Sequence, residues 1–178
     1  AELVIAKLEK EGTAAEADVA FAIDPLVKGL STKGDFCSPN GEKCFARIAA
    51  LVRKTAAYKH IRVVTVSADI FSNAGSTIVE ELAFALSAGN DYIARLTDAG
   101  LTVDEAARKL RFSFSVTSNY FMEIAKFRAA RMLWANIVKA YNPEKHCAGK
   151  MMIHAATSKW NQTVYDPYVN MLRGTTEA

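Results

Sequence analysis

The side chains of this sequence that could do chemistry are few and widely separated. Asp24, Asp69 and Asp104 are candidate catalytic carboxylates, but they fall in different parts of the chain and no base–nucleophile pair stands near them. Asp104 also fits the first turn of a helix, where negative charge is favoured. Lys109 and Arg111 are candidate phosphate ligands, because lysine offers a point charge and arginine a forked donor. A solvated or ion-paired basic pair also explains them, so both interpretations stay open.

The spacing of the cysteines and histidines matches no metal site. The cysteines are Cys37, Cys44 and Cys147, and the histidines are His60, His146 and His154. An odd cysteine count without zinc-like spacing predicts free thiols in a reducing cytosol. A loop disulfide between Cys37 and Cys44 is the alternative. We therefore expect no metal and a cytoplasmic location.

Composition argues against two classes of partner. The formal net charge is only +3, and no block of Lys and Arg suggests nucleic-acid binding. No apolar run approaches the roughly 20 residues that span a bilayer, and no signal-peptide pattern opens the chain. The 178 residues suffice for one domain with a sizeable core. We predict a single domain over residues 1–178, with neither a nucleic-acid nor a membrane partner.

Four short segments alternate between apolar and small or polar side chains, as strands with two different faces do. They are Val19–Asp24, Val63–Asp69, Leu110–Val116 and Met151–Ala156. In the third, Phe112 and Phe114 alternate with polar residues such as Ser113. Parallel strands covered on both faces normally read as continuous apolar runs. A small, polar face on every strand therefore indicates a lumen rather than a packed core.

Helical segments separate these strands. We expect helices over Glu2–Glu11, Ala46–Tyr58, Gly75–Asp98 with a break or bend near Gly89, a short helix opened by a Thr102/Glu105 capping box, Asn119–Tyr141 and Gln162–Arg173, with the longest loop over residues 31–43. One helix followed by four βα units gives parallel neighbouring strands. A complete (βα)8 barrel needs about 250 residues. The predicted fold class is α/β, a partial TIM barrel of about four βα units.

The helix over Asn119–Tyr141 carries the strongest amphipathic pattern. Its broad apolar face is made of Ile124, Phe127, Trp134, Val138 and Tyr141. Glu123 and Lys126 are three residues apart, which predicts a structural ion pair. We expect Trp134 and Trp160 to lie in the core.

Four segments resemble the methylmalonyl-CoA mutase family. They are NYFMEIAKFRAARMLWA at Asn119–Ala135, TVDEAARKL at Thr102–Leu110, NAGSTIVEELAFALSAG at Asn73–Gly89, and HAATSKW at His154–Trp160, which is similar to the family's His-x-x-Thr-Ser-Gly-Trp. The resemblance implies the C-terminal half of an eight-stranded barrel through which the CoA chain threads past small polar side chains. It also implies that the first strands precede residue 1 and that the cobalamin domain follows residue 178.

The resemblance further implies that the family's catalytic side chains are replaced. The family interconverts methylmalonyl-CoA and succinyl-CoA by a radical route with adenosylcobalamin. Its active-site Gln, substrate-carboxylate Arg, neighbouring Tyr, thioester-polarising His and cofactor-proximal Gln fall on Ala22, Thr32, Asp69, Ile70 and Ala156. Each lost donor to a developing charge is worth about 3 kcal/mol in the barrier. We therefore expect no catalytic residue and no cofactor bound by this chain, with adenosylcobalamin belonging to the family's holoenzyme.

Weak CoA contacts are the remaining implied site. The family's CoA-contacting Arg-Leu-Ser becomes Lys109-Leu110-Arg111. Ser113 and His154 are the other candidate CoA contacts, because each is a polar residue of a strand that alternates between apolar and small or polar side chains. His154 is at a family active-site position, although a structural hydrogen bond is the alternative.

The predicted function is that of a small, non-catalytic mutase subunit that acts as a scaffold for a large catalytic subunit in a heterodimer. Three alternatives remain. The chain could be a competent adenosylcobalamin-dependent acyl-CoA mutase, or a CoA-binding module without chemistry. It could also form a homo-oligomer in which two half barrels pair.

Overall fold

A four-stranded parallel sheet is the centre of the computed structural model, which describes residues 1–27 and 41–177. The strands lie side by side in chain order: β1 (Val19–Ile23), β2 (Ile61–Ser67), β3 (Leu110–Val116) and β4 (Ile153–Thr157). The helices are α1 (Glu2–Lys10), α3 (Gly41–Lys54), α4 (Asp69–Asn73), α5 (Ile78–Asp98), α6 (Val103–Arg108), α7 (Tyr120–Ala140), the 3-10 turn η1 (His146–Gly149) and α8 (Pro167–Glu177). The predicted α/β half barrel is confirmed.

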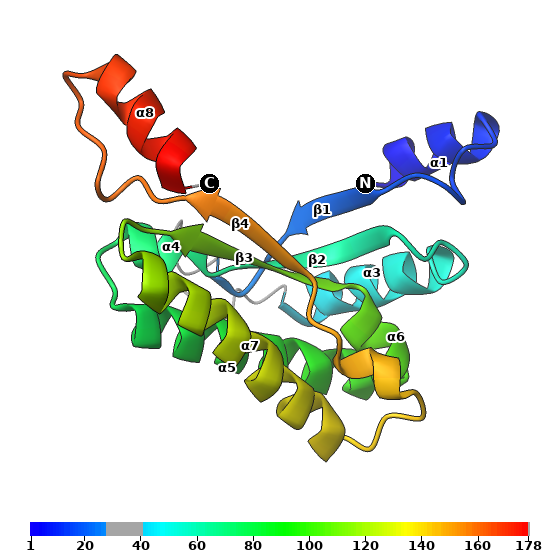
Figure 1. The fold of residues 1–178 in the computed structure, drawn as a ribbon. Helices are drawn as coiled ribbons and strands as arrows, with labels where there is room; N and C mark the ends of the chain where they lie inside the picture. Colours follow the sequence, from blue (N-terminus) through cyan, green and yellow to red (C-terminus); the bar gives the residue numbers. More distant parts are fainter. Residues whose placement is uncertain (28–40, 178) are drawn as a thin grey trace.

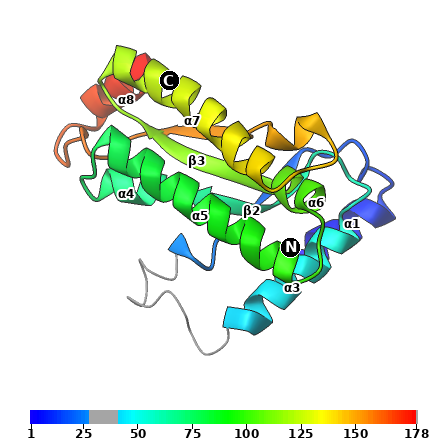
Figure 2. The same ribbon diagram turned by 90° about the horizontal axis from the view of Figure 1, so that it is seen from below.

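One face of the sheet is covered by helices. Figures 1 and 2 show α3, α5 and α7 on the same side, while α1 and α8 lie at opposite ends of the molecule. The apolar row of β3 packs into this layer: the Phe112 ring lies 4.7 Å from the Trp134 ring of α7, and Phe114 lies 6.0 Å from Phe127, both edge-on. Such aromatic pairs add about 0.5–1.5 kcal/mol beyond the area that they bury.

The small polar side chains lie on the other face. In the parallel register, Thr65 is opposite Arg111, Ser67 is opposite Ser113, and Ser113 is opposite His154. Residues opposite each other in register share a face, and this row alternates with the phenylalanines that contact α7. The polar row therefore faces away from the helical layer, where an inner barrel wall would lie.

Gly89 is a packing residue and does not break its helix. The predicted helix over Gly75–Asp98 divides into α4 and α5, because Gly75 turns the chain at φ +99° and Thr77 caps α5 with Glu80 in a capping box. Helix α5 then continues through Gly89. A Cβ atom there would lie 2.7 Å from the Phe112 ring and 2.8 Å from Trp134. The glycine lets α5 approach β3 and α7 closely.

Two expectations for the apolar residues differ from the structure. Trp160 was expected in the core, but it is 68% exposed and rests on Gly75, whose missing side chain makes room for the indole. Ile124 is also exposed, because the buried line of α7 runs through Glu123, Lys126 and Trp134 instead. The expectation for Trp134 is confirmed, since it is 1% exposed.

The bounds of two helices also differ from those expected from the sequence. The last helix begins at Pro167 rather than Gln162, because Asp166 accepts the Val169 N–H and proline is tolerated in the first turn. Helix α3 covers Gly41–Lys54, several residues earlier than expected. None of the helices within residues 1–27 and 41–177 has the length and apolar character that a bilayer crossing requires.

Candidate functional site

The positions predicted to correspond to the family's catalytic groups are mostly occupied by apolar side chains. Ala22 is exposed on β1, and Ala156 on β4 is paired with Ser115. Ile70 lies in the first turn of α4, directly after β2, where it is half-buried against the core. Asp69 is the first residue of α4, where the helix dipole stabilises a carboxylate. Thr32 lies outside the described residues.

The polar row on the open face is the part of the predicted site that the structure brings together. Arg111, Ser113 and His154 occupy β3 and β4, with Ser113 and His154 in direct register. The Arg111 Nε donates to Thr65 Oγ1 at 3.3 Å, so the guanidinium lies along β2. Ser113 is 8% exposed and His154 is exposed. These three side chains could contact one extended ligand along the strands.

Lys109 does not join this row. Its Nζ donates to the carbonyl oxygens of Thr55 at 2.6 Å, Tyr58 at 2.7 Å and Ile61 at 3.2 Å. An ammonium has three N–H donors, and the three carbonyls account for all of them. Burial, followed by the nearby charges of Arg62 and Arg108, lowers the pKa of Lys109 to about 8. The contacts therefore describe a structural residue that ties the α3–β2 connection to the start of β3.

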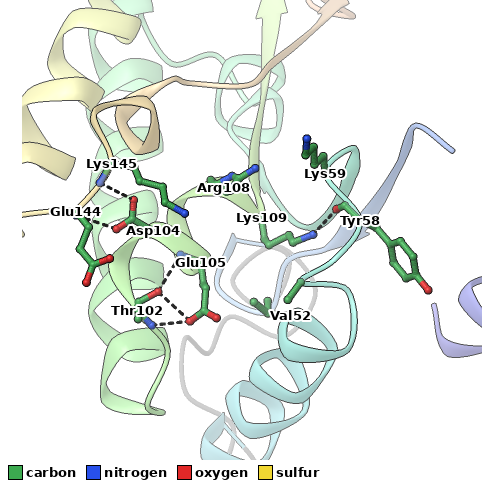
Figure 3. A pocket seen from close by; sticks show the side chains of 11 residues that line it. Val52, Tyr58, Lys59, Thr102, Asp104, Glu105, Arg108, Lys109, Glu144 and Lys145 are labelled. Atoms are coloured by element: carbon green, nitrogen blue, oxygen red, sulfur yellow. Dashed lines mark hydrogen bonds between the residues drawn. The ribbon is translucent and has the colours of Figure 1, made fainter. Parts of the chain in front are cut away.

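A cavity of about 210 Å³ opens beside Lys109, between α3, α6 and the chain before η1 (Figure 3). Charges of both signs line it: Lys59, Arg108, Lys109 and Lys145 are basic, and Asp104, Glu105 and Glu144 are acidic. Asp104 accepts the backbone N–H groups of Glu144 at 2.9 Å and Lys145 at 3.1 Å. Glu105 accepts from Thr102 in the predicted capping box. The Asp104 carboxylate thus holds the chain before η1 against α6, and the Glu105 carboxylate caps α6. These contacts give the acidic side chains of the cavity a structural role.

A buried ionic cluster lies at the C-terminal end of β3. Lys126 Nζ is 2.6 Å from Glu123 Oε2 and 2.7 Å from Glu81 Oε2, and it donates to the Ser115 carbonyl at 2.6 Å. The expected Glu123–Lys126 pair is confirmed, but both side chains are buried, and Glu81 was not foreseen. Burial raises the pKa of Glu81 above its usual range even beside Lys126. The only signal in the sequence for Glu81 would have been its helical spacing from the buried residues of α5.

A second buried carboxylate ties β1 to β2. Asp24 Oδ2 accepts the Ser67 N–H at 2.7 Å, and Oδ1 accepts the Val27 N–H and the Tyr92 hydroxyl at 3.0 and 2.6 Å. Burial and the charge of Asp24 raise the pKa of Tyr92. These three hydrogen bonds join Asp24 to β2, to α5 and to the turn after β1, so the structure gives this carboxylate a structural role.

The end of α4, the helix that follows β2, is joined to the loop after β4. Asn73 Oδ1 accepts the Lys159 N–H at 2.8 Å, and the Ser158 hydroxyl lies 3.4 Å from the same oxygen. Ser158 is fully buried. This contact fixes the HAATSKW segment at the end where barrel enzymes carry their active sites.

The described residues offer no metal site. No group of three or more His, Cys, Asp or Glu within the described ranges is arranged to hold a metal ion. Ala22, Ile70 and Ala156 offer no side-chain donor or acceptor. Cys44 and Cys147 are free thiols, while Cys37 lies outside the described residues.

The fold and the polar row on β3 and β4 define the class of protein. It is a parallel α/β half barrel with helices on one face of the sheet and polar side chains on the other. The chain belongs to the methylmalonyl-CoA mutase family, because the family profile described as methylmalonyl-CoA mutase matches residues 2–178.

Individual relatives agree with this assignment. A methylmalonyl-CoA mutase small subunit from Porphyromonas gingivalis is 44% identical over 153 residues, which are 85% of this chain and 23% of that protein. The mitochondrial methylmalonyl-CoA mutase of Bos taurus is 32% identical over 174 residues, 96% of this chain and 23% of its own length. A large subunit from Propionibacterium freudenreichii subsp. shermanii is 39% identical over 115 residues, 65% of this chain and 16% of that subunit. The chain spans about a quarter or less of these relatives, and the family includes both small and large subunits.

Proposed function

We propose that this chain is part of a non-catalytic small subunit of a methylmalonyl-CoA mutase and that it acts as a scaffold for a large catalytic subunit. The main support is the chemistry at the strand ends. Ala22, Ile70 and Ala156 stand where the family carries polar catalytic groups. The similarity to a small subunit over 85% of the chain agrees with this role.

The energetic argument follows from these replacements. A positioned donor to a developing charge lowers a barrier by about 3 kcal/mol, or roughly a hundredfold in rate. Loss of several such donors together removes useful turnover of the thioester. What remains is the C-terminal half of a barrel, held rigid by the Asp24 and Lys126 networks. A rigid wall without reacting groups suits a structural subunit.

The proposal also covers cofactor and location. The family uses adenosylcobalamin, which supplies the radical chemistry when bound. We place that cofactor on the catalytic partner, because the side chains of Ala22, Ile70 and Ala156 offer it no donor or acceptor. The free thiols of Cys44 and Cys147 suit a reducing cytoplasm.

Reconstitution tests this function. The purified chain is assayed with methylmalonyl-CoA and adenosylcobalamin, alone and after mixing with a large catalytic mutase subunit. We expect no turnover by the chain alone, and a complex with the large subunit on size exclusion. Turnover by the chain free of any partner would overturn the proposal, and so would failure to form the complex.

A second candidate is a CoA-ester site on the polar row. The observation that favours it is the shared face of Arg111, Ser113 and His154 on β3 and β4. Calorimetric titration with CoA tests it, with Arg111→Ala as the variant and exposed Arg128→Ala on α7 as the matched control. Heat that is lost only in the Arg111 variant supports the site, and no heat at millimolar CoA removes it.

A further inference from the structure

A second cavity, of about 380 Å³, lies at the N-terminal ends of β2, β3 and β4. Its charged side chains are all basic: Lys59, Arg62, Arg108 and Lys150 line it, and no Asp or Glu of the described residues does. The cavity shares Lys59 and Arg108 with the mixed-charge cavity, but it contains none of the carboxylates found there. We call these four side chains the basic cluster.

The walls of this cavity come from three consecutive connections of the fold. Arg62 lies at the start of β2, Arg108 is the last residue of α6 before β3, and Lys150 follows η1 before β4. All residues that line the cavity fall between Lys59 and Met152, away from both ends of the chain. Since β2, β3 and β4 are neighbours in the sheet, the sheet itself holds these segments together.

The cations of the basic cluster have no salt bridges. None of the four side chains forms one with any residue that the structure describes. Arg62 donates from Nη1 to the Lys59 carbonyl, but its Nε is buried and has no hydrogen-bond partner among the described residues. Buried donors are almost always paired, and an unpaired one points to a bound ion or ligand. The Arg62 guanidinium therefore has a donor to offer.

The charges around this cavity also repel one another. Burial lowers the pKa of Arg62, the charge of Asp18 opposes this effect, and the charge of Arg108 adds to it. Burial lowers the pKa of Lys109 as well, and the charges of Arg62 and Arg108 lower it further. An anion placed among these cations would offset their repulsion, because an opposite charge favours the charged form of each.

The rest of the cavity wall is apolar. Leu110, Met151 and Met152 line it beside the basic cluster. The volume of about 380 Å³ lies within the range of about 300–1,000 Å³ that small-molecule sites occupy, so the cavity admits more than a single ion. Arginine offers a fork that matches phosphate oxygens, and lysine offers a point charge. This combination suits a phosphate group that is joined to a small organic group.

We propose that the basic cluster binds the polyphosphate group of a small organic phosphate, whose organic part rests on the apolar wall. Arg62 and Arg108 act as forked donors to the phosphate oxygens. Lys59 and Lys150 supply the point charges. The site lies at the opposite end of the strands from Ile70, and the residues of the polar row do not line it. The inference does not rest on the mutase role, so either can fail without the other.

Isothermal titration calorimetry of the full chain with ADP tests the proposal. We expect saturable binding at millimolar ADP or below, weakened by added salt because the charges are screened. Inorganic pyrophosphate should compete with ADP, and adenosine should not bind. Arg62→Gln and, at an exposed position, Arg108→Gln should each weaken ADP binding about tenfold or more, because charge-assisted hydrogen bonds are lost. Arg128→Gln is the matched control, since Arg128 is exposed on α7 and does not line the cavity.

The remaining outcomes count against the proposal. No heat with ADP or pyrophosphate overturns it, and so does heat with CoA alone, because the cations would then serve the CoA ester. ADP binding that Arg111→Ala abolishes and Arg62→Gln leaves intact would place the ligand on the polar row instead. Equal losses in Arg62→Gln, Arg108→Gln and Arg128→Gln refute the assignment to the basic cluster.

Discussion

Removal of the Lys126 ammonium should destabilise the chain strongly. Its side chain is fully buried and lies within 2.7 Å of carboxylates from two different side chains, Glu81 and Glu123. Lys126→Met keeps the length of the side chain but leaves both carboxylates without their cation. Removing one partner from a buried ion pair costs about 3–5 kcal/mol, and the Ser115 carbonyl loses a donor as well. We expect a loss of about 4 kcal/mol of unfolding free energy at pH 8.

The pH dependence of the loss gives a second check. Burial raises the pKa of Glu81 above the ordinary 4.5, so between 4.5 and the raised value the folded state binds more protons than the unfolded state. Stability then rises as pH falls through that window. Without Lys126 the pKa of Glu81 rises further, because the cation that favours its ionised form is gone, so the deficit of the variant should shrink from pH 8 to pH 5.

Urea unfolding followed by circular dichroism measures both effects. Lys7→Met is the matched control, because Lys7 is exposed and 3.8 Å from Glu11 on the surface. Exposed pairs contribute about 0.2–1 kcal/mol. If Lys126→Met costs no more than Lys7→Met, or if its deficit does not change with pH, the buried cluster does not stabilise the fold as argued.

Three further substitutions test other parts of the structure by the same unfolding assay. Gly89→Ala should cost about 1–3 kcal/mol by overpacking, because its Cβ would meet Phe112 and Trp134 at 2.7–2.8 Å; an unchanged midpoint would contradict this packing. Thr77→Ala should cost about 1 kcal/mol by removing the cap of α5, and no loss would refute the cap. Lys109→Met should cost about 1–3 kcal/mol by leaving carbonyls unpaired. Folding lowers the pKa of Lys109 from 10.5 to about 8, so between pH 8 and pH 10.5 the unfolded state binds more protons than the folded state. The difference in unfolding free energy between wild type and Lys109→Met should therefore increase as pH rises through this range. A constant difference would contradict the burial of the ammonium.

The alternation of strand residues was the most informative part of the sequence. Phe112 and Phe114 were expected on one face and Ser113 on the other, and the structure places them so because adjacent residues of a strand point to opposite sides. The Thr102/Glu105 capping box was equally readable, since its two hydrogen bonds are local. Features fixed by contacts within a few residues could therefore be predicted.

Features fixed by long-range contacts could not. Glu81 is 45 residues from Lys126, and an acidic residue in an amphipathic helix reads as a solvent-facing side chain until its partner is located. Trp160 is 68% exposed, and its ring rests on Gly75, a contact that no periodicity records. At the site, Arg111, Ser113 and His154 share a face through the sheet register, whereas the three carbonyls that hold Lys109 lie 48 to 54 residues away.

The most direct test of the scaffold role is native mass spectrometry of this chain purified from its own cells. The account predicts that a large catalytic mutase subunit is present in the same complex and that any cobalamin travels with that subunit. A chain that carries cobalamin itself, with no mutase partner, would contradict the account.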